Sequence, residues 1–524
     1  MKKLISYAFI IVLTFTSCKK FLDVNSPNPN QPISSTVQLL LPTALAGTAS
    51  FSSTFNSAAA ETGLYMTNAG GYGGFGSVET YAYSNADLNG GWSLFNVLED
   101  YYQVKTLSTD SADLRYFNAV ARIMLSHGYQ MLVDNFNSVP YFEALKGGTD
   151  KIYTAKFDDP ADIYVDLVKQ IDTAINMIND GLDDDVAPPI EITAGQDPMF
   201  GGDMEMWKKF ANTLKLRIIV RGHGKATFNN TSFTDDGFLT TDAQINPGYT
   251  RDNGKQNPKW NTWAYTYTGG TGNLGWMPST FVLSFYNGKL YDEGRGYETF
   301  YQFPNTVNNR LGLHPVDLPA SPAGSAWYPS SNRTGTTAGA APGPLKGPDA
   351  PMPILTASES YFWQAEARLN GILTTGATTK DLFNEGIAAS FNYIFLLPDG
   401  SLDDDAHAYY EQYLDDNSDS RLVNFDLATT PAQQLEAIIT QKFIAMNMVN
   451  GDQAWNDYRR TGYPAIPNWS ANLTGAQTFA SASSNSTRPD GLPTRVLYPT
   501  TEISANPNVP TGISSFTSLI FWAK

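Results

Sequence analysis

The chain has one cysteine, four histidines and few charged residues for its length of 524 residues. A single thiol, Cys18, excludes any disulfide within the chain. The histidines (His127, His223, His314 and His407) form no His-Glu-x-x-His pattern and no pair at ligand spacing, so we expect no zinc site. Charged residues make up 16%, below the roughly 25% of an average soluble domain.

Positive charge is also scarce, with 34 Lys and Arg against 51 Asp and Glu. A net charge of −17 and a pI near 4.6 disfavour nucleic acid and anionic membrane surfaces as partners. The chain contains no Gly-x-Ser-x-Gly elbow and no phosphate-binding Gly-Lys-Ser/Thr loop. The acidic runs 183–185 and 403–405 lack the spacing of a calcium loop and favour helix caps or turns. We therefore expect neither a metal nor a cofactor.

The N-terminus has the build of a secretory signal peptide. Lys2 and Lys3 precede an apolar run at 8–15, which is too short to cross roughly 30 Å of hydrocarbon as a permanent helix. Thr16 and Ser17 then lead to Cys18, the position at which a bacterial lipoprotein receives diacylglycerol. The alternative is an ordinary signal peptide with a coincidental cysteine. We expect removal of residues 1–17, lipidation of Cys18, an extended Asn- and Pro-rich spacer at 18–35 and a mature net charge of −19.

The rest of the chain predicts a mainly α body, 36–524, with little strand. Apolar residues recur three or four apart in six segments, and each predicts an amphipathic helix: 117–132, 163–178, 207–218, 359–369, 382–395 and 436–449. Asp158, Asp159 and Pro160 mark the start of the second. The strand signal is confined to short patches such as 263–267. No repeat of fixed period is visible in the spacing alone.

Long stretches rich in Gly, Pro, Asn and Thr separate these helices, at about 70–89, 246–353 and 464–524. Loops of this length are uncommon unless they carry function, and binding sites commonly lie on loops held by a rigid scaffold. We therefore expect the ligand and the partner to meet these loops.

Four stretches, in order along the chain, resemble the SusD/RagB family of nutrient-binding outer-membrane lipoproteins, and its SusD-like branch in particular. They are CKKFLDVN at 18–25 with LLPTA at 40–44, WKKFANTLKLR at 207–217, ESYFWQAEA at 359–367, and QKFIA at 441–445 followed by GDQAWNDYRRTGYP at 451–464. Two features depart from the family pattern. The segment 291–296 stands where an Asp-Pro-Arg-Leu stretch is common, and no acidic run follows Cys18.

The resemblance implies stacked helix pairs similar to tetratricopeptide repeats, with long loops layered on one side. It also implies capture of an oligosaccharide, or in some members a peptide, at the outer-membrane surface. The cargo would pass to a TonB-dependent, SusC-like β-barrel transporter, and only the lipid anchor would touch the membrane. The anchored body is expected to face the extracellular side.

Sugar receptors offer flat aromatic rings and polar rims, and rigid rings lose little conformational entropy on binding. The candidate ligand residues are therefore Trp260, Trp263, Tyr265 and Trp276 in one loop, Tyr72 and Tyr83 in another, and Trp327 in a third. For any one of these rings, packing of loop onto helix, or contact with the barrel, is the alternative.

Residues on the helical motifs have a simpler interpretation. We expect Trp207, Trp363 and Trp455 to lie in the core. Arg459 and Arg460 with Asp457 form either an anion clamp or a salt bridge that fixes a helix end before Gly462, and we favour the salt bridge.

These observations predict a surface-tethered capture protein that is not an enzyme. A surface glycoside hydrolase with two carboxylates about 5 to 10 Å apart is the alternative, because 51 acidic residues leave such a pair open. A purely structural surface subunit that binds the barrel and no nutrient is a third possibility.

Overall fold

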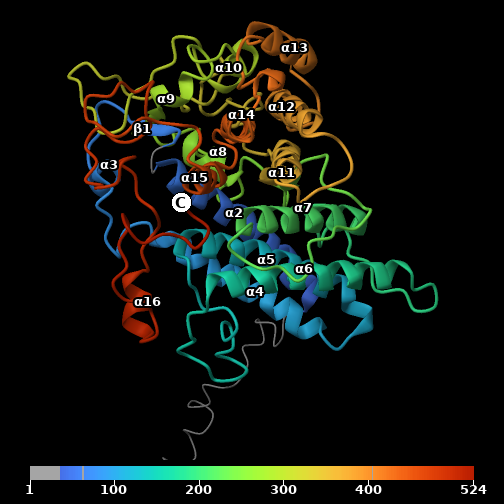
Figure 1. Ribbon diagram of the computed structural model, residues 1–524. Coiled ribbons are helices and arrows are strands. Elements are labelled where there is room, and N and C mark those ends of the chain that lie inside the picture. The colour runs from blue at the N-terminus through green and yellow to red at the C-terminus, as the bar shows by residue number, and fades with distance from the viewer. Residues whose placement is uncertain (1–35, 62–63, 404) are drawn as a thin grey trace, which may run out of the picture.

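The computed structural model describes residues 36–61, 64–403 and 405–524. The predictions for the leader, for Cys18 and for the spacer at 18–35 lie outside these residues. Within the described ranges the chain is mainly helical, as predicted, with fifteen α-helices and four short strands (Figure 1). None of these helices combines the length and the apolar composition needed to cross a membrane.

The helices are α2 (Val37–Glu61), α3 (Gly76–Thr80), α4 (Leu94–Ser108), α5 (Arg115–Phe136), α6 (Pro160–Leu182), α7 (Met204–Gly222), α8 (Pro258–Trp263), α9 (Thr280–Leu283), α10 (Glu293–Thr299), α11 (Ala357–Leu369), α12 (Thr379–Phe395), α13 (Ala406–Asp416), α14 (Pro431–Ala445), α15 (Gly451–Thr461) and α16 (Thr500–Ala505). The strands are β1 (Met66–Asn68), β2 (Ala243–Ile245), β3 (Trp276–Pro278) and β4 (Met352–Leu355).

The long helices pack on one another in sequence order. Helix α4 packs on α5, α5 on α6, α6 on α7, α7 on α11, α11 on α12 and α14, and α12 on α13. In Figure 1, α4 to α7 form the lower layer and α11 to α14 the upper right. Helix α2 closes the stack by contacting α4 and α15. This is the tetratricopeptide-like succession of helix pairs that the sequence resemblance implied.

The predicted helix at 163–178 shows why the apolar stripes were informative. It lies within α6, where Ile163, Leu167 and Ile171 are buried against α5 and α7. The side chain of Asp159 accepts from the backbone N–H of Ala161 at 2.8 Å and so caps the first turn. Five further predicted segments also fall on helices, α5, α7, α11, α12 and α14.

Two local predictions were wrong. Helix α14 ends at Ala445 and does not continue to Val449. The backbone carbonyls of Met448 and Val449 instead accept from the buried ammonium of Lys259, with 3.0 Å between Nζ and the Val449 oxygen. The patch 263–267 is no strand: Trp263 ends α8, which Asn257 caps, and the residues after it form only an isolated bridge from Tyr265 to Thr271. The strands pair elsewhere, β1 with β3 and β2 with β4, both antiparallel.

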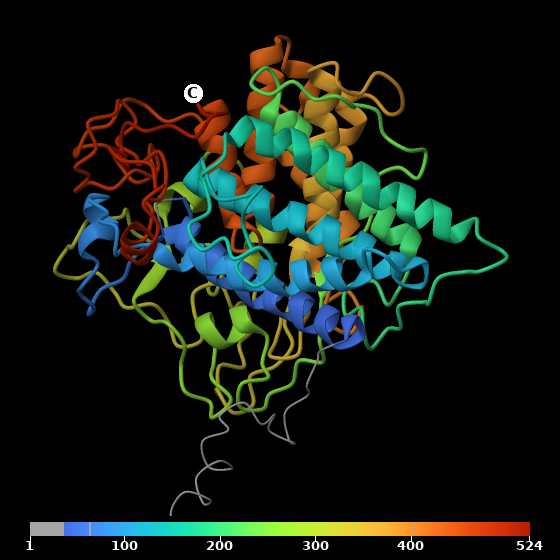
Figure 2. The ribbon, with the colours of Figure 1, turned by 90° about the horizontal axis from the view of Figure 1, so that it is seen from below.

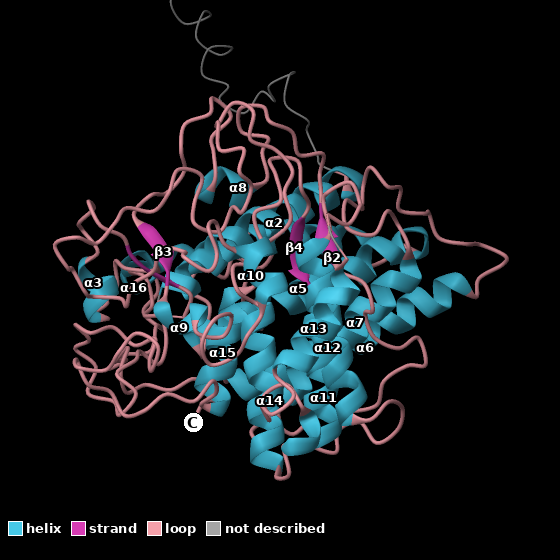
Figure 3. Cartoon of the chain, turned by 90° about the horizontal axis from the view of Figure 1, so that it is seen from above, coloured by secondary structure: helices cyan, strands magenta, loops and turns pink. Residues whose placement is uncertain are grey.

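The long loops gather along two sides of the helical body (Figure 3). The two ends of the 246–353 segment, about 246–272 and 333–350, lie around α8 on one side, whereas its middle joins the opposite side, where β3 pairs with β1. On the other, residues 70–89 lie beside 464–524, and the two segments appear together as the blue and red loops of Figure 2. Backbone and side-chain bonds join them: Asn485 N–H donates to the Thr80 carbonyl at 2.8 Å, and the Asn85 amide to the Tyr498 carbonyl at 2.7 Å. The loop layer is thus tied together across more than 400 residues of sequence.

Candidate functional site

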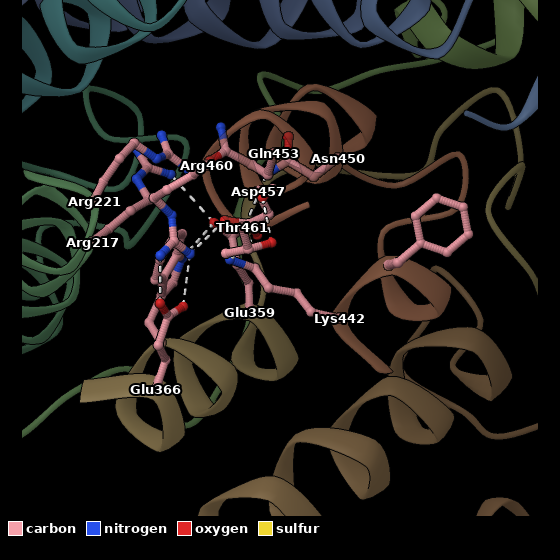
Figure 4. A network of polar contacts seen from close by, with 12 residues as sticks. Arg217, Arg221, Glu359, Glu366, Lys442, Asn450, Gln453, Asp457, Arg460 and Thr461 are labelled. Atoms are coloured by element: carbon pink, nitrogen blue, oxygen red, sulfur yellow. Dashed lines mark hydrogen bonds and ion pairs between the residues drawn. The ribbon is translucent and has the colours of Figure 1, made fainter. Parts of the chain in front are cut away.

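The helical motifs meet in a buried ionic network at the junction of α7, α11, α14 and α15 (Figure 4). The guanidinium of Arg460 pairs with Glu366 at 2.8 Å and with Asp457 at 3.1 Å. Asp457 also forms an ion pair with Lys442, with 2.9 Å between Lys442 Nζ and Asp457 Oδ2. The favoured interpretation of this motif as a structural salt bridge is therefore confirmed for Arg460 and Asp457, whereas Arg459 donates to the backbone carbonyls of Thr494 and Asp134.

A second part of the network joins α7 to α11. Arg217 lies 3.4 Å from Glu359, and Glu359 also accepts from the indole N–H of Trp363 at 3.1 Å and from the Asn450 amide at 3.0 Å. The ammonium of Lys442 stands 3.2 Å from the centre of the Trp363 ring. Trp207, Trp363 and Trp455 are all buried, as predicted.

Neighbouring charges decide the protonation of this network. Burial alone would raise the pKa of Asp457, but Lys442 and Arg460 outweigh it and hold that pKa below its usual value. Burial likewise opposes the charge on Arg460, yet Glu366 and Asp457 keep its pKa above the ordinary range. By contrast, burial and the nearby Glu359 raise the pKa of Asp452 to about 7. The network therefore serves stability, and its carboxylates are out of reach of a substrate.

The segment 291–296, which departs from the family pattern, also has a structural role. Asp292 caps α10 and pairs with Arg295 at 2.7 Å, and both side chains are buried. The Arg295 guanidinium lies 4.4 Å from the centre of the Phe391 ring, which belongs to α12. The pair therefore fixes α10 against the helical body.

The acidic runs form caps and turns, as favoured from the sequence. Asp184 accepts from the N–H of Ala187 at 2.9 Å and pairs with Arg115 at 3.4 Å. Asp405 caps α13 by accepting from the N–H groups of His407 and Ala408. Within the described part of the chain, no group of three or more His, Cys, Asp or Glu is arranged to hold a metal ion.

Most of the aromatic rings proposed as ligand contacts are buried, which corrects the expectation of an open aromatic face. Trp260, Trp263, Tyr265 and Trp327 are at most 2% exposed, and Tyr83 is 9% exposed. The first four belong to a cluster in which Trp260 meets Tyr328 edge to face, with ring centres 5.1 Å apart. Because the loop layer contains few helices and strands that could pack on one another, its aromatic rings form its hydrophobic core. These rings hold the loops together and are closed to a ligand in this conformation.

Trp276 is also buried, at 8% exposed, but Tyr72 is different, because its ring is exposed close to the strand pair β1 and β3 that holds Trp276. Tyr72 is 44% exposed, and Phe75, half-buried, meets Trp276 edge to face at 5.1 Å. Gly275 lies against the rings of Tyr72 and Phe75: a Cβ added to Gly275 would be 3.7 Å from the Tyr72 ring and 3.8 Å from the Phe75 ring. We call Tyr72, Phe75 and Trp276 the aromatic patch.

Polar groups lie close to the aromatic patch along β1 and α3. Asn68, which pairs with Trp276, donates its amide to the Leu313 carbonyl at 2.9 Å. The next residue, His314, is half exposed and its Nε2 lies 2.8 Å from a carboxylate oxygen of Glu79. The patch therefore combines apolar rings with an exposed imidazole and a carboxylate. That combination suits a ligand that has both apolar faces and hydroxyl groups.

The sequence analysis missed two hollows on the other loop side, which share Tyr249. One, of about 440 Å³, lies between α2, α8 and 247–256, and the other, of about 430 Å³, lies between 249–251, 336–340 and 348–349. Asn246 accepts from the N–H groups of Gly248 and Tyr249 and so fixes the turn that presents the half-buried ring. An aromatic residue directly after an Asn-Pro-Gly turn was the available signal.

Comparisons with known proteins agree with this architecture. A family model described as "Starch-binding associating with outer membrane" matches residues 29–234. A second, described as "Susd and RagB outer membrane lipoprotein", matches residues 332–517. No curated protein matches the chain.

Several solved structures share the fold. A SusD homolog from Bacteroides fragilis is 17% identical, with 93% of this chain and 99% of that chain covered and a TM-score of 0.64. A SusD-like protein of Bacteroidetes is 17% identical over 94% and 100% of the two chains, with a TM-score of 0.67. A chitin-binding protein is 19% identical over 93% and 99%, with a TM-score of 0.63. At these identities the likeness shows the fold alone.

Proposed function

Because the chain belongs to the SusD-like branch of the SusD/RagB family of outer-membrane lipoproteins, we propose that it captures oligosaccharides, or peptides, at the cell surface and delivers them to a TonB-dependent, SusC-like transporter. Its role is nutrient binding at the outer membrane. The description of the first family model, which names starch binding, supports a carbohydrate as the cargo over a peptide.

The aromatic patch is the ligand surface that we propose. Tyr72 is the ring that carries the argument, since it is 44% exposed and stands beside Phe75 and Trp276. A sugar ring can stack its C–H face on Tyr72 while its hydroxyl groups meet His314 and Glu79 at the rim. The buried rings around Trp260 act indirectly, by holding the loop layer in shape.

The positions of the acidic side chains fit a protein that binds its ligand without hydrolysing it. Glu359, Glu366 and Asp457 are enclosed in ion pairs within the core. Near the aromatic patch, Glu79 pairs with His314, and Asp87 accepts from the hydroxyl groups of Ser77 and Ser84. A glycoside hydrolase would need two carboxylates facing one bond. The patch therefore favours capture over hydrolysis.

Anchoring at Cys18 through lipid, on the extracellular side, completes the proposal. A stable contact with a barrel buries roughly 2,000 Å² or more of total surface, so much of the remaining loop layer is expected to cover the transporter. Changing Cys18→Ser is expected to release the protein from the outer-membrane fraction. Retention of the variant in that fraction would contradict lipid anchoring.

The ligand surface is tested by measuring affinity for a panel of oligosaccharides and peptides. Tyr72→Ala is expected to weaken binding of the cognate oligosaccharide about tenfold, which corresponds to the loss of about 1.4 kcal/mol. Tyr291→Ala removes a comparably exposed ring on another face and is the matched control. Equal affinity of the Tyr72 variant and the control would exclude the aromatic patch as the ligand site.

A further inference from the structure

A hollow separate from the two beside Tyr249 lies in the helical layer, away from the aromatic patch. It is formed by α4, α5, α6 and the segment that follows α5. These helices lie in the lower part of Figure 1, and Figure 2 shows the molecule from below. Its volume is about 160 Å³. Its lining residues are Tyr102, Lys105, Arg122, Leu125, Ser126, Tyr129, Tyr141, Phe142, Ala144, Lys146, Asp166 and Gln170. We call it the α4–α6 pocket.

Three cations line this pocket, although the chain carries a net charge of −17. Lys105 comes from α4, Arg122 from α5 and Lys146 from the segment after α5. In the described part of the chain, none of the three has a carboxylate oxygen within the 4.0 Å that defines an ion pair. Positive charge therefore exceeds negative charge in this lining, where Asp166 acts on Lys105 and Arg122 without forming an ion pair with either.

The one acid in the lining is already engaged by neutral groups. Asp166 accepts from the Tyr141 hydroxyl at 2.7 Å and from the Gln170 amide at 3.1 Å. The Arg122 guanidinium is held by neutral acceptors as well, Asn118 at 2.7 Å and the Gln170 amide oxygen. These bonds fix the direction of the guanidinium and leave its charge free to act on a ligand.

The electrostatic state of Lys105 agrees with this arrangement. Partial burial lowers the pKa of Lys105, and repulsion from Arg122 and Lys146 lowers it further, while Asp166 offsets part of this shift. Burial also lowers the pKa of Arg122. An anion between these groups would relieve the mutual repulsion and form charge-assisted hydrogen bonds.

The walls around the cations are aromatic. The rings of Tyr102, Tyr129, Tyr141 and Phe142 surround them, and Tyr129 and Tyr141 meet edge to face at 4.7 Å. A volume of about 160 Å³ is close to that of a protein cavity of about 150 Å³ that holds a benzene ring. That is room for a carboxylate and part of a ring, and too little for an oligosaccharide.

We propose that the α4–α6 pocket binds the carboxylate of a small ring-shaped organic acid, such as a sugar acid. Lys105, Arg122 and Lys146 receive the carboxylate, and the tyrosine rings contact the rest of the molecule. This site is independent of the proposed function at the aromatic patch.

The test is the affinity of the purified full-length protein for glucuronate, with glucose as the neutral counterpart and sodium sulfate as a bare anion. We expect saturable binding of glucuronate, none of glucose, and weaker binding of sulfate. Lys105→Gln and Lys146→Gln are each expected to weaken glucuronate binding about tenfold or more. Lys169→Gln, on an exposed position of α6, is the matched control and is expected to bind as the parent does.

Folding is not expected to limit this test, because Lys105 and Lys146 have no ion-pair partner to lose. Lys105→Gln is expected to raise the melting temperature of the unliganded protein, since it removes a charge that burial disfavours and that Arg122 repels. Tyr72→Ala distinguishes binding at the α4–α6 pocket from binding at the aromatic patch, because it is expected to leave the affinity of the pocket for glucuronate unchanged. The proposal fails if glucuronate does not bind at millimolar concentration, if glucose or sulfate binds equally well, or if the lysine variants bind as Lys169→Gln does.

Discussion

At the scale of single residues, the charged side chains fall into two classes with opposite roles. Arg460, Lys442 and Asp457 are almost fully buried and satisfy one another in the core. Lys105 and Lys146 are half-buried, and neither forms an ion pair with an acidic side chain among the described residues. The first class fixes the helices, and the second is available for a ligand.

The buried network gives a prediction for Arg460. Arg460→Met leaves Glu366 buried without a cation and is expected to lower the free energy of unfolding by about 3 to 5 kcal/mol. Arg421→Met breaks the more exposed pair with Glu436 and is expected to cost less than about 1 kcal/mol. Chemical denaturation measures both.

A second change identifies the cause of that loss. The double variant Arg460→Met, Glu366→Met removes both charges and is expected to regain a large part of the lost stability. A double variant less stable than Arg460→Met would show that lost packing, and not an unpaired charge, is responsible.

The protonation of Asp452 gives a prediction for pH. Its folded pKa is about 7, raised by burial and then by Glu359, whereas an unfolded Asp titrates near about 3.9. Between these values the folded state holds a proton that the unfolded state has lost, so the contribution of Asp452 to stability falls as pH rises from about 4 to 7. Asp452→Asn is expected to become progressively more stable than the parent from pH 5 to pH 8. An equal difference at both pH values, measured by denaturation, would refute this assignment.

At the scale of elements, the helices that sequence alone predicted are those with one apolar face. Helix α6 has a regular stripe and a cap, and both are recovered in the structure. Helix α2 was missed because Pro42 lies inside it and small residues occupy much of its length. Helix α4 was missed because its buried positions, such as Leu98 and Tyr101, alternate with polar and aromatic residues that give no clear stripe.

The contact between α11 and α12 gives a prediction at the scale of elements. A Cβ on Gly386 would lie 2.7 Å from Cε1 of the buried Phe362 ring. Helix propensity favours Ala over Gly by about 1 kcal/mol, whereas overpacking costs typically 1 to 3 kcal/mol. Gly386→Ala is therefore expected to lower the free energy of unfolding by about 1 kcal/mol. Gly195→Ala, where a Cβ meets nothing within 4 Å, is the control with no expected loss; a stabilised Gly386→Ala would mean that propensity outweighs packing.

The loops show where prediction from sequence ends. Composition identified the segments that carry aromatic rings, yet it gave no sign of which rings other loops cover. Trp260 and Tyr72 both lie in stretches that contain Asn, Gly and further aromatic residues, but only Tyr72 is exposed. Exposure depends on contacts between segments far apart in the chain, such as 70–89 with 464–524, and local patterns do not contain this information.

At the scale of the whole molecule, a stack of helix pairs supports loops on two sides (Figure 3). One hydrophobic cluster extends from Val37 in α2 to Trp522 near the C-terminus. The aromatic patch and the α4–α6 pocket lie in different layers of this body, the first in loops and the second among helices. We expect the loop layer to serve cargo and transporter while the helices hold its shape.

The central claim is capture without chemistry, and one measurement tests it most directly. The purified protein is titrated with the best-binding oligosaccharide by calorimetry, and the sugar from the same sample is then sized by mass spectrometry. We predict saturable binding and full recovery of the oligosaccharide at its original length. Shortened products, or the absence of binding to every oligosaccharide and peptide in the panel, would contradict the account.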